Sequence, residues 1–154
     1  MIRYGKKVER VDLRGFSGDR GPEASRVRMA TKEWGLRAKD FASIAQLRHE
    51  FREFMRSLGA GDTVPHEIIF GELVTNAMRY GENPMSVNAC VENGAVRLRV
   101  NCAGHCFDLN ERLATSPSLY GGRGLQIVAK LSDSLTVAAN EDCPCCVTAT
   151  FPLV

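Results

Sequence analysis

The dipeptide Asn93-Gly94 constrains the fold of this chain more than any other feature of the sequence. It separates two runs with the composition of strands, Met85 to Val91 and Ala95 to Val100. An Asn-Gly connection of two residues favours a type I′ turn, whose twist matches that of two antiparallel strands. In the second run apolar residues alternate with two arginines, which predicts one buried and one solvated face. The sequence therefore predicts an antiparallel hairpin with one face against a core.

Helical patterns flank this hairpin on both sides. The first begins at Ser43, where Gln46 completes a capping-box pattern, and it ends at the Gly-Ala-Gly of 59–61. The second covers about 62–80 and the third about 122–131. An apolar stripe on the second helix, expected to pack on the sheet, comprises Ile69, Leu73, Ala77 and Tyr80.

Further strands are predicted at 28–38, 134–139 and 146–151, and residues 108–121 have the composition of a loop. The resulting order is β-α-α-β-β-α-β-β. It predicts an α+β fold, a two-layer sandwich in which a mostly antiparallel sheet carries its helices on one face.

The length of 154 residues suits one domain. Residues 1–27 mix basic side chains with Gly, Ser and Pro and lack periodicity, so we expect a flexible basic tail before a domain at 28–154. The net charge of +2 gives no reason to expect direct nucleic-acid binding. We also expect a cytoplasmic protein without membrane contact, because the sequence has neither a long apolar run nor a secretory signal pattern.

The helix over 62–80 also has a polar face. Glu72 and Asn76 are four residues apart and share this face, which Arg79 joins three residues later. A carboxylate beside a carboxamide offers the hard oxygens that Mg²⁺ prefers, and the carboxylate could accept a proton from an attacking hydroxyl. The alternative is a solvated face with a hydrogen-bonded i,i+4 pair.

A glycine-rich segment, Gly121-Gly122-Arg123-Gly124-Leu125, opens the third helix. Glycines let a backbone approach a ligand closely, and helix N-termini attract phosphate. The alternative is a flexible turn before a helix.

Taken in order, these segments resemble the GHKL (Bergerat-fold) ATPase superfamily, and within it the small bacterial anti-sigma-factor serine kinases. Residues 72–80 resemble the N box of that family, and residues 122–128 resemble its second glycine box. The resemblance implies that Glu72 is the general base and Asn76 a magnesium ligand, with the ATP phosphates at the glycine box. It further implies that residues 108–121 form a mobile lid over ATP.

The same resemblance implies a function and partners. The kinase would use ATP and Mg²⁺ to phosphorylate a Ser or Thr of an anti-sigma antagonist, and it would regulate transcription by partner switching with a sigma factor. It would also form a homodimer.

The first glycine box departs from the family pattern Asp-x-Gly-x-Gly. Cys102 stands where the adenine-reading Asp is expected, followed by Gly104 and Cys106, and Cys146 stands at the Thr that supports this Asp. A thiol is a poor acceptor, and losing such a hydrogen bond costs about 1–3 kcal/mol. By the resemblance, the residues expected at the nucleotide are Asn76, Arg79, Cys102, Gly104, Gly122, Arg123, Gly124, Leu125 and Cys146.

Cysteines could gather where adenine normally sits, if the fold is the one implied; the set comprises Cys102, Cys106, Cys143, Cys145 and Cys146. In a reducing compartment structural disulfides are not expected. The cysteines could instead bind zinc or an iron–sulfur cluster with His105, form a redox-switchable disulfide, or be buried beside a modified nucleotide site. Three functions stay open: a kinase, a non-catalytic module that binds a sigma factor or antagonist, and a metal- or redox-gated regulator.

Overall fold

The computed structural model describes residues 10–12, 29–114 and 123–154. Its strands form one sheet and are β1 (Arg10–Asp12), β2 (Met29–Leu36), β3 (Glu82–Glu92), β4 (Ala95–Ala103), β5 (Ser134–Ala138) and β6 (Cys145–Pro152). Its α-helices are α1 (Ile44–Ser57), α2 (Val64–Tyr80), α3 (Leu109–Ala114) and α4 (Gly124–Leu131), and a short 3-10 helix, η1 (Phe41–Ser43), precedes α1.

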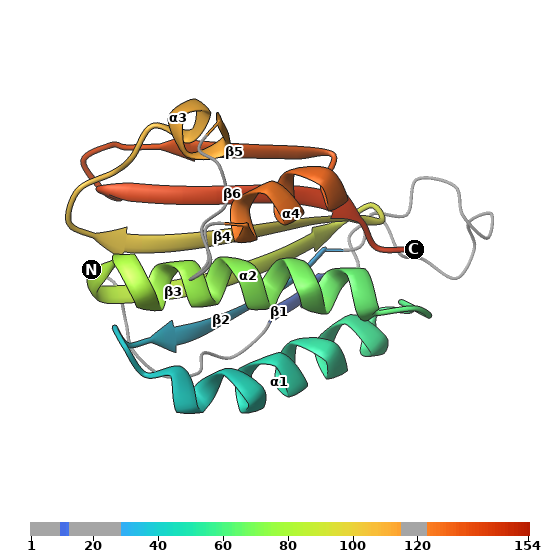
Figure 1. Ribbon diagram of the computed structural model, residues 1–154. Helices are drawn as coiled ribbons and strands as arrows, with labels where there is room; N and C mark the ends of the chain where they lie inside the picture. Colours follow the sequence, from blue (N-terminus) through green and yellow to red (C-terminus); the bar gives the residue numbers. More distant parts are fainter. Residues whose placement is uncertain (1–9, 13–28, 115–122) are drawn as a thin grey trace, which may run out of the picture.

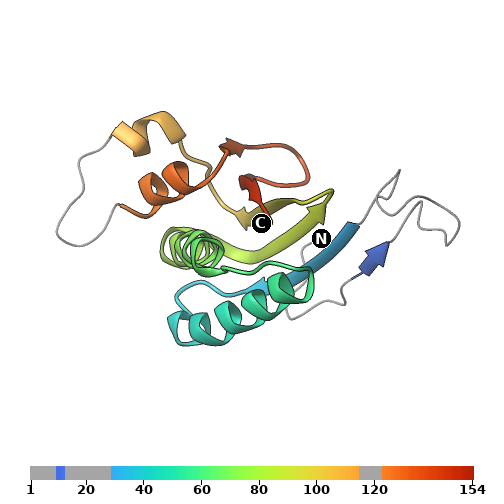
Figure 2. The same ribbon diagram turned by 90° about the vertical axis from the view of Figure 1, so that its right-hand side faces the viewer.

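The sheet is antiparallel throughout its described part, with the strand order β1-β2-β3-β4-β6-β5. Helices α1, α2 and α4 lie on one face of it (Figures 1 and 2). The predicted α+β sandwich, with its helices on one face, is therefore confirmed. No helix in the described part of the chain is long and apolar enough to cross a membrane.

The hairpin at the centre of the sheet forms as predicted. β3 and β4 pair up to Glu92↔Ala95, and the two turn residues have positive φ, 53° at Asn93 and 79° at Gly94. Glycine adopts this conformation freely and asparagine tolerates it, which is why an Asn-Gly pair closes the turn. The hairpin places the even-numbered residues of β4, from Val96 to Cys102, on the buried side.

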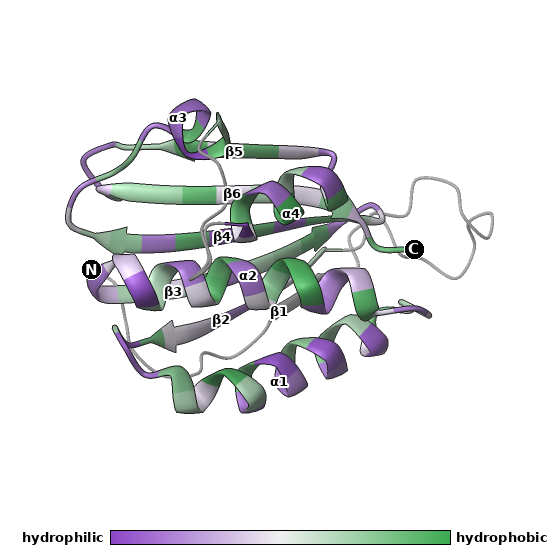
Figure 3. Cartoon of the chain, viewed as in Figure 1, coloured by the Kyte–Doolittle hydropathy of each residue, from purple (hydrophilic) through white to green (hydrophobic). Residues whose placement is uncertain are grey.

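The core fills the space between the sheet and the helices α1 and α2. Trp34 of β2 is 1% exposed and meets Phe70 of α2 edge to face, at 5.7 Å between ring centroids. Phe51 of α1 stacks on Phe70 at 4.4 Å. Along α1, hydrophilic and hydrophobic residues alternate with the turns of the helix (Figure 3). Burial of each such side chain contributes about 1.5–3 kcal/mol, so this cluster fixes α1 and α2 on the sheet.

The start of α1 differs from prediction. Ser43 does not cap the helix with its side chain; its Oγ donates instead to the carbonyl of Asp40, at 2.9 Å. The reason is that Ser43 is already in a helical conformation at the end of η1. A serine in that conformation bonds back to the preceding turn.

Two further segments gain structure that the sequence did not predict. Strand β1, within the expected tail of 1–27, pairs with β2 in the register Val11↔Ala30, a partner that no local pattern reveals. The rest of that tail lies outside the described residues. Helix α3 occupies part of the expected loop 108–121, and the amide of Glu111 donates to Asp108 Oδ1 at 3.0 Å. The spacing of Asp108 and Glu111 is an N-terminal helix signal that could have been read. Residues 115–121 of that loop lie outside the described part.

Candidate functional site

The polar face of α2 lines a cleft that the N-terminal end of α4 completes. We call this the polar compartment; the residues that line it include Glu72, Thr75, Asn76, Arg79, Gly124 and Leu125. The opposite side of α2 is anchored by Leu73, Val74 and Ala77, each at most 2% exposed. Burial of that side orients Glu72 and Asn76 toward α4. The structure thus brings together the acid, the amide and the start of the glycine-opened helix, as the sequence predicted.

The contact between Glu72 and Gly124 is close. A Cβ atom at Gly124 would lie 2.6 Å from Glu72 Oε1, so any other residue at this position would displace the carboxylate. Gly124 is the first residue of α4. Free backbone amides and the positive end of the helix dipole lie at such a position. The compartment therefore places a carboxylate beside a helix end that attracts anions.

Arg112 of α3 crosses the cleft. Its Nη2 donates to Asn76 Oδ1 at 3.1 Å. Its guanidinium lies 5.0 Å from the ring centroid of Tyr80 and 4.7 Å from that of Phe107. Gln126 of α4 donates to the carbonyl of Arg112 at 3.3 Å, which fixes α3 to α4. Sequence reasoning missed Arg112, because it lies in the segment that was expected to be a loop.

Tyr80 does not pack against the sheet as the predicted stripe required. It is 59% exposed and lines the cleft. The Tyr80 ring contacts the guanidinium of Arg112 instead of a strand of the sheet.

A second compartment adjoins the first, and Asn76, Tyr80 and Arg112 line both. We call it the thiol compartment, because Cys102 and Cys145 line it together with His105 and Phe107. Its volume is about 170 Å³, against about 40 Å³ for the polar compartment. The larger space for a bulky group is therefore at the thiol end.

The thiols of this compartment are neutral at physiological pH. Burial, aided by the neighbouring Cys106, raises the pKa of Cys102 to about 11. Burial and a hydrogen bond with Cys106 raise the pKa of Cys145 to about 12. A neutral thiol is a weak donor and a weak acceptor. Cys102 thus lies in the thiol compartment, where the resemblance implied a contact with adenine, but it offers a thiol and not a carboxylate.

The predicted cluster of five cysteines is divided between the two faces of the sheet. Cys145 pairs with Cys102 and Cys146 pairs with Asn101, so the side chains of Cys145 and Cys146 point to opposite faces. The prediction that Cys146 contacts the nucleotide is therefore wrong. No group of three or more potential ligands is placed to hold a metal ion among the described residues, which contradicts the alternative of a zinc or iron–sulfur site.

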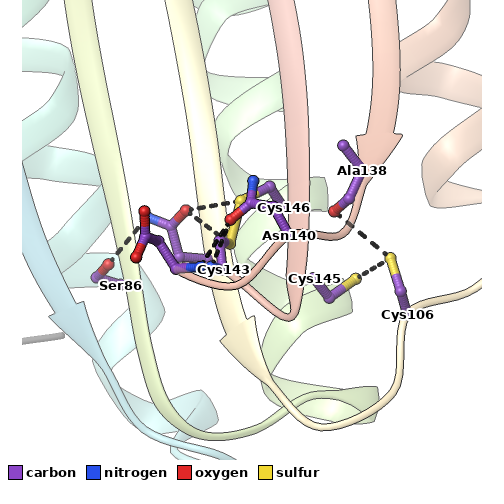
Figure 4. The surroundings of a disulfide bond; sticks show 9 residues. Ser86, Cys106, Ala138, Asn140, Cys143, Cys145 and Cys146 are labelled. Atoms are coloured by element: carbon purple, nitrogen blue, oxygen red, sulfur yellow. Dashed lines mark hydrogen bonds between the residues drawn. A yellow bond between two sulfur atoms is a disulfide. The ribbon is translucent and has the colours of Figure 1, made fainter. Parts of the chain in front are cut away.

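On the outer face Cys143 and Cys146 form a disulfide with an S–S distance of 2.07 Å (Figure 4). The two sulfurs lie 3.2 and 3.3 Å from Asn101 Oδ1. Asn140 accepts from the amide of Cys143 at 2.8 Å and so holds the turn that brings this cysteine back to Cys146. The expectation that no structural disulfide forms is wrong for this pair, and of the alternatives left open for the cysteines a disulfide is the one that forms here. Cys90 is free and buried.

The remaining predicted contacts lie at the edges of the site. Gly104 has φ +87°, and a Cβ there would lie 2.7 Å from the Glu82 carboxylate. It borders Glu82 rather than either compartment, in the part of the chain that the structure describes. Arg123 is exposed at the N-cap of α4, and Gly122 lies outside the described residues.

The residues that line the polar compartment have the chemistry that a magnesium-bound triphosphate needs. Asn76 and Glu72 supply the oxygens, Arg79 and Arg112 supply positive charge, and Gly124 leaves the backbone open. The thiol compartment has room at the adjoining end but lacks the acceptor that an adenine amine needs.

Comparison with known proteins agrees with this geometry. No curated protein matches the sequence. The family model described as the histidine kinase-like ATPase domain matches residues 24–151, a range that includes both compartments and every helix of the described structure. This chain belongs to the histidine kinase-like ATPase domain family.

Proposed function

We propose that this chain is a serine/threonine protein kinase of the anti-sigma-factor type, which uses ATP and Mg²⁺. It would phosphorylate an anti-sigma antagonist, regulate transcription by partner switching with a sigma factor, and act as a homodimer. The observation that carries the proposal is the meeting of Glu72, Asn76 and Gly124 in one cleft. The N-terminus of α4 attracts phosphate as well as a carboxylate, and Asn76 beside it offers an oxygen to Mg²⁺.

Each residue of the polar compartment has a role in this proposal. Asn76 Oδ1 would hold the magnesium ion, and Glu72 would accept the proton of the attacking seryl or threonyl hydroxyl. Arg79 and the first amides of α4 would compensate the negative charge of the phosphates. Bound MgATP supplies the phosphoryl group and a cation that neutralises its charge.

Arg112 adds a competition at Asn76. Its guanidinium already donates to Asn76 Oδ1, so the arginine and a metal ion would share or contest that oxygen. The two aromatic rings beside Arg112 keep the guanidinium in the cleft when it leaves Asn76. There it remains available to a phosphate oxygen.

A second candidate function is a non-catalytic module that binds a sigma factor or an antagonist. The neutral thiol of Cys102 favours this second function, because a thiol is a weak acceptor and the thiol compartment would then bind adenine weakly. The two candidates differ in what the polar compartment does. Only the kinase needs the proton acceptor at Glu72.

Isothermal titration with ATP, with and without Mg²⁺, tests the site first. We expect binding that weakens at least tenfold without Mg²⁺, and an Asn76→Ala variant that has lost this dependence. Absence of ATP binding by the reduced wild-type protein would leave the non-catalytic module as the function.

Glu72→Gln then tests catalysis. Transfer of the γ-phosphate to seryl or threonyl residues, followed with labelled ATP in a lysate of the native host, should fall about 10²-fold or more, as it does when a general base is lost. ATP affinity should change little. Glu53→Gln is the matched control, because Glu53 is an exposed carboxylate on α1 that pairs with Arg56 at 3.3 Å and with Arg52 at 3.9 Å. Unchanged transfer by Glu72→Gln would remove Glu72 from the mechanism.

A further inference from the structure

We propose that Cys106 and Cys145 are a redox-active pair that forms a disulfide in the wall of the thiol compartment, and that this bond tightens nucleotide binding. The disulfide itself stands independently of the function proposed above. Its coupling to nucleotide rests on that function.

The geometry of the two sulfur atoms carries the first half of the proposal. Cys145 Sγ donates to Cys106 Sγ at 2.8 Å, across 39 positions of sequence (Figure 4). An S–S bond is about 2.05 Å long, so closure needs a movement below about 1 Å. Cys145 is in β6, and Cys106 follows the end of β4. Two parts of the wall are therefore already in place for the bond.

Cys102 is the rival partner, because it lies directly opposite Cys145 in the strand register. Its sulfur, however, lies under the C-terminal end of α2, 2.9 Å from the position that a Cβ at Gly81 would take. The described sulfur contact of Cys145 is with Cys106. The geometry therefore favours Cys106 over Cys102.

Accessibility sets the order of the chemical steps. Cys145 is 4% exposed, and its raised pKa keeps its thiol protonated, whereas Cys106 is partly exposed and can be reached from solvent. The thiolate of Cys106 attacks one sulfur of a low-molecular-weight disulfide, forms a mixed disulfide and releases one thiol. Cys145 then loses its proton and attacks the sulfur of Cys106, and the second thiol leaves with that proton. Two protein thiols are oxidised and one small disulfide is reduced.

The neighbours of Cys106 connect the bond to the cleft. His105 and Phe107 both line the thiol compartment. The ring of Phe107 lies against the Arg112 guanidinium, which in turn donates to Asn76. A bond from Cys106 to β6 fixes this wall before the nucleotide arrives, and a preorganised wall costs less to order on binding. We expect the dissociation constant for MgATP to be 3- to 10-fold lower in the oxidised protein.

Disulfide mapping on the full-length protein tests the bond. The protein is equilibrated with reduced and oxidised glutathione, quenched, alkylated and digested, and cross-linked peptides are identified by mass spectrometry. A peptide pair joining Cys106 to Cys145 is expected, and it should persist in Cys90→Ser, a buried cysteine away from the compartment. The pair should be lost in Cys106→Ser and Cys145→Ser, whose folding is checked by circular dichroism. Joining of Cys145 to Cys102, or no bond at Cys145 under oxidising conditions, would overturn the proposal.

Titration with MgATP tests the coupling on the oxidised and reduced forms. The ratio of the two dissociation constants for MgATP should also appear as an equal change in the equilibrium constant for disulfide formation with glutathione when MgATP is added. This follows because coupling between two equilibria is reciprocal. Cys106→Ser should abolish the redox effect, which separates this bond from the outer-face disulfide of Cys143 and Cys146. Equal affinities in both redox states would overturn the coupling. If the bond forms but neither state binds MgATP, the proposed nucleotide site and the coupling both fail, while the disulfide stands.

Discussion

Gly124→Ala separates the function of the cleft from the stability of the fold. The new Cβ would lie 2.6 Å from Glu72 Oε1, where 3.4–4 Å is ordinary contact, so the carboxylate must retreat by about 1 Å. The far end of a flexible side chain can move in this way at little cost to the fold. Alanine is also a better helix residue than glycine, by up to about 1 kcal/mol, so the free energy of unfolding should stay level or rise slightly.

The cost of Gly124→Ala should appear in ligand binding instead. The methyl group enters the polar compartment beside the first amides of α4, where the phosphates would lie, so we expect the dissociation constant for MgATP to rise at least tenfold, which equals about 1.4 kcal/mol. Isothermal titration measures the affinity, and urea denaturation measures the free energy of unfolding.

Gly71→Ala is the matched control for this experiment. Gly71 is in the interior of α2, and its Cβ would meet only the Arg48 side chain, at 3.5 Å. This variant should gain stability and keep its affinity for MgATP. If Gly124→Ala binds MgATP as tightly as the wild-type protein, the end of α4 is not part of the nucleotide site. A loss of more than about 3 kcal/mol in unfolding free energy, a loss typical of severe core damage, would show that Glu72 cannot retreat.

Two further predictions concern stability. Gly81→Ala should lower the free energy of unfolding by about 1–3 kcal/mol, because its Cβ would lie 2.7 Å from the backbone carbonyl of Ala77. Urea denaturation measures this change, and a variant as stable as the wild-type protein would refute that close packing. The unfolding free energy of the reduced protein should stay constant below pH 9 and fall as the pH rises toward 11. In the unfolded chain Cys102 and Cys145 ionise near pH 9.0, whereas in the folded protein burial raises their pKa to about 11 and about 12. The unfolded state therefore releases protons first as the pH rises, which favours unfolding. Denaturation series at several pH values should show a weaker fall for Cys102→Ala, and identical profiles would contradict the assignment.

The sequence by itself determined the central hairpin, the longer helices and the polar half of the site. The Asn93-Gly94 turn needs only two residues that accept positive φ, and the face shared by Glu72 and Asn76 follows from the period of a helix. These features depend on residues a few positions apart. Such features can be read from a single chain.

The tertiary structure alone decided where the cysteines and Arg112 of α3 lie. Cys145 and Cys146 are consecutive residues of β6, so their side chains lie on opposite faces of the sheet. The register of β6 against β4 determines that Cys145 faces the cleft and Cys146 the outer face. Arg112 reaches Asn76 only because α3 packs against α4. Strand register and helix docking depend on contacts between residues far apart in the chain, and no local pattern contains that information.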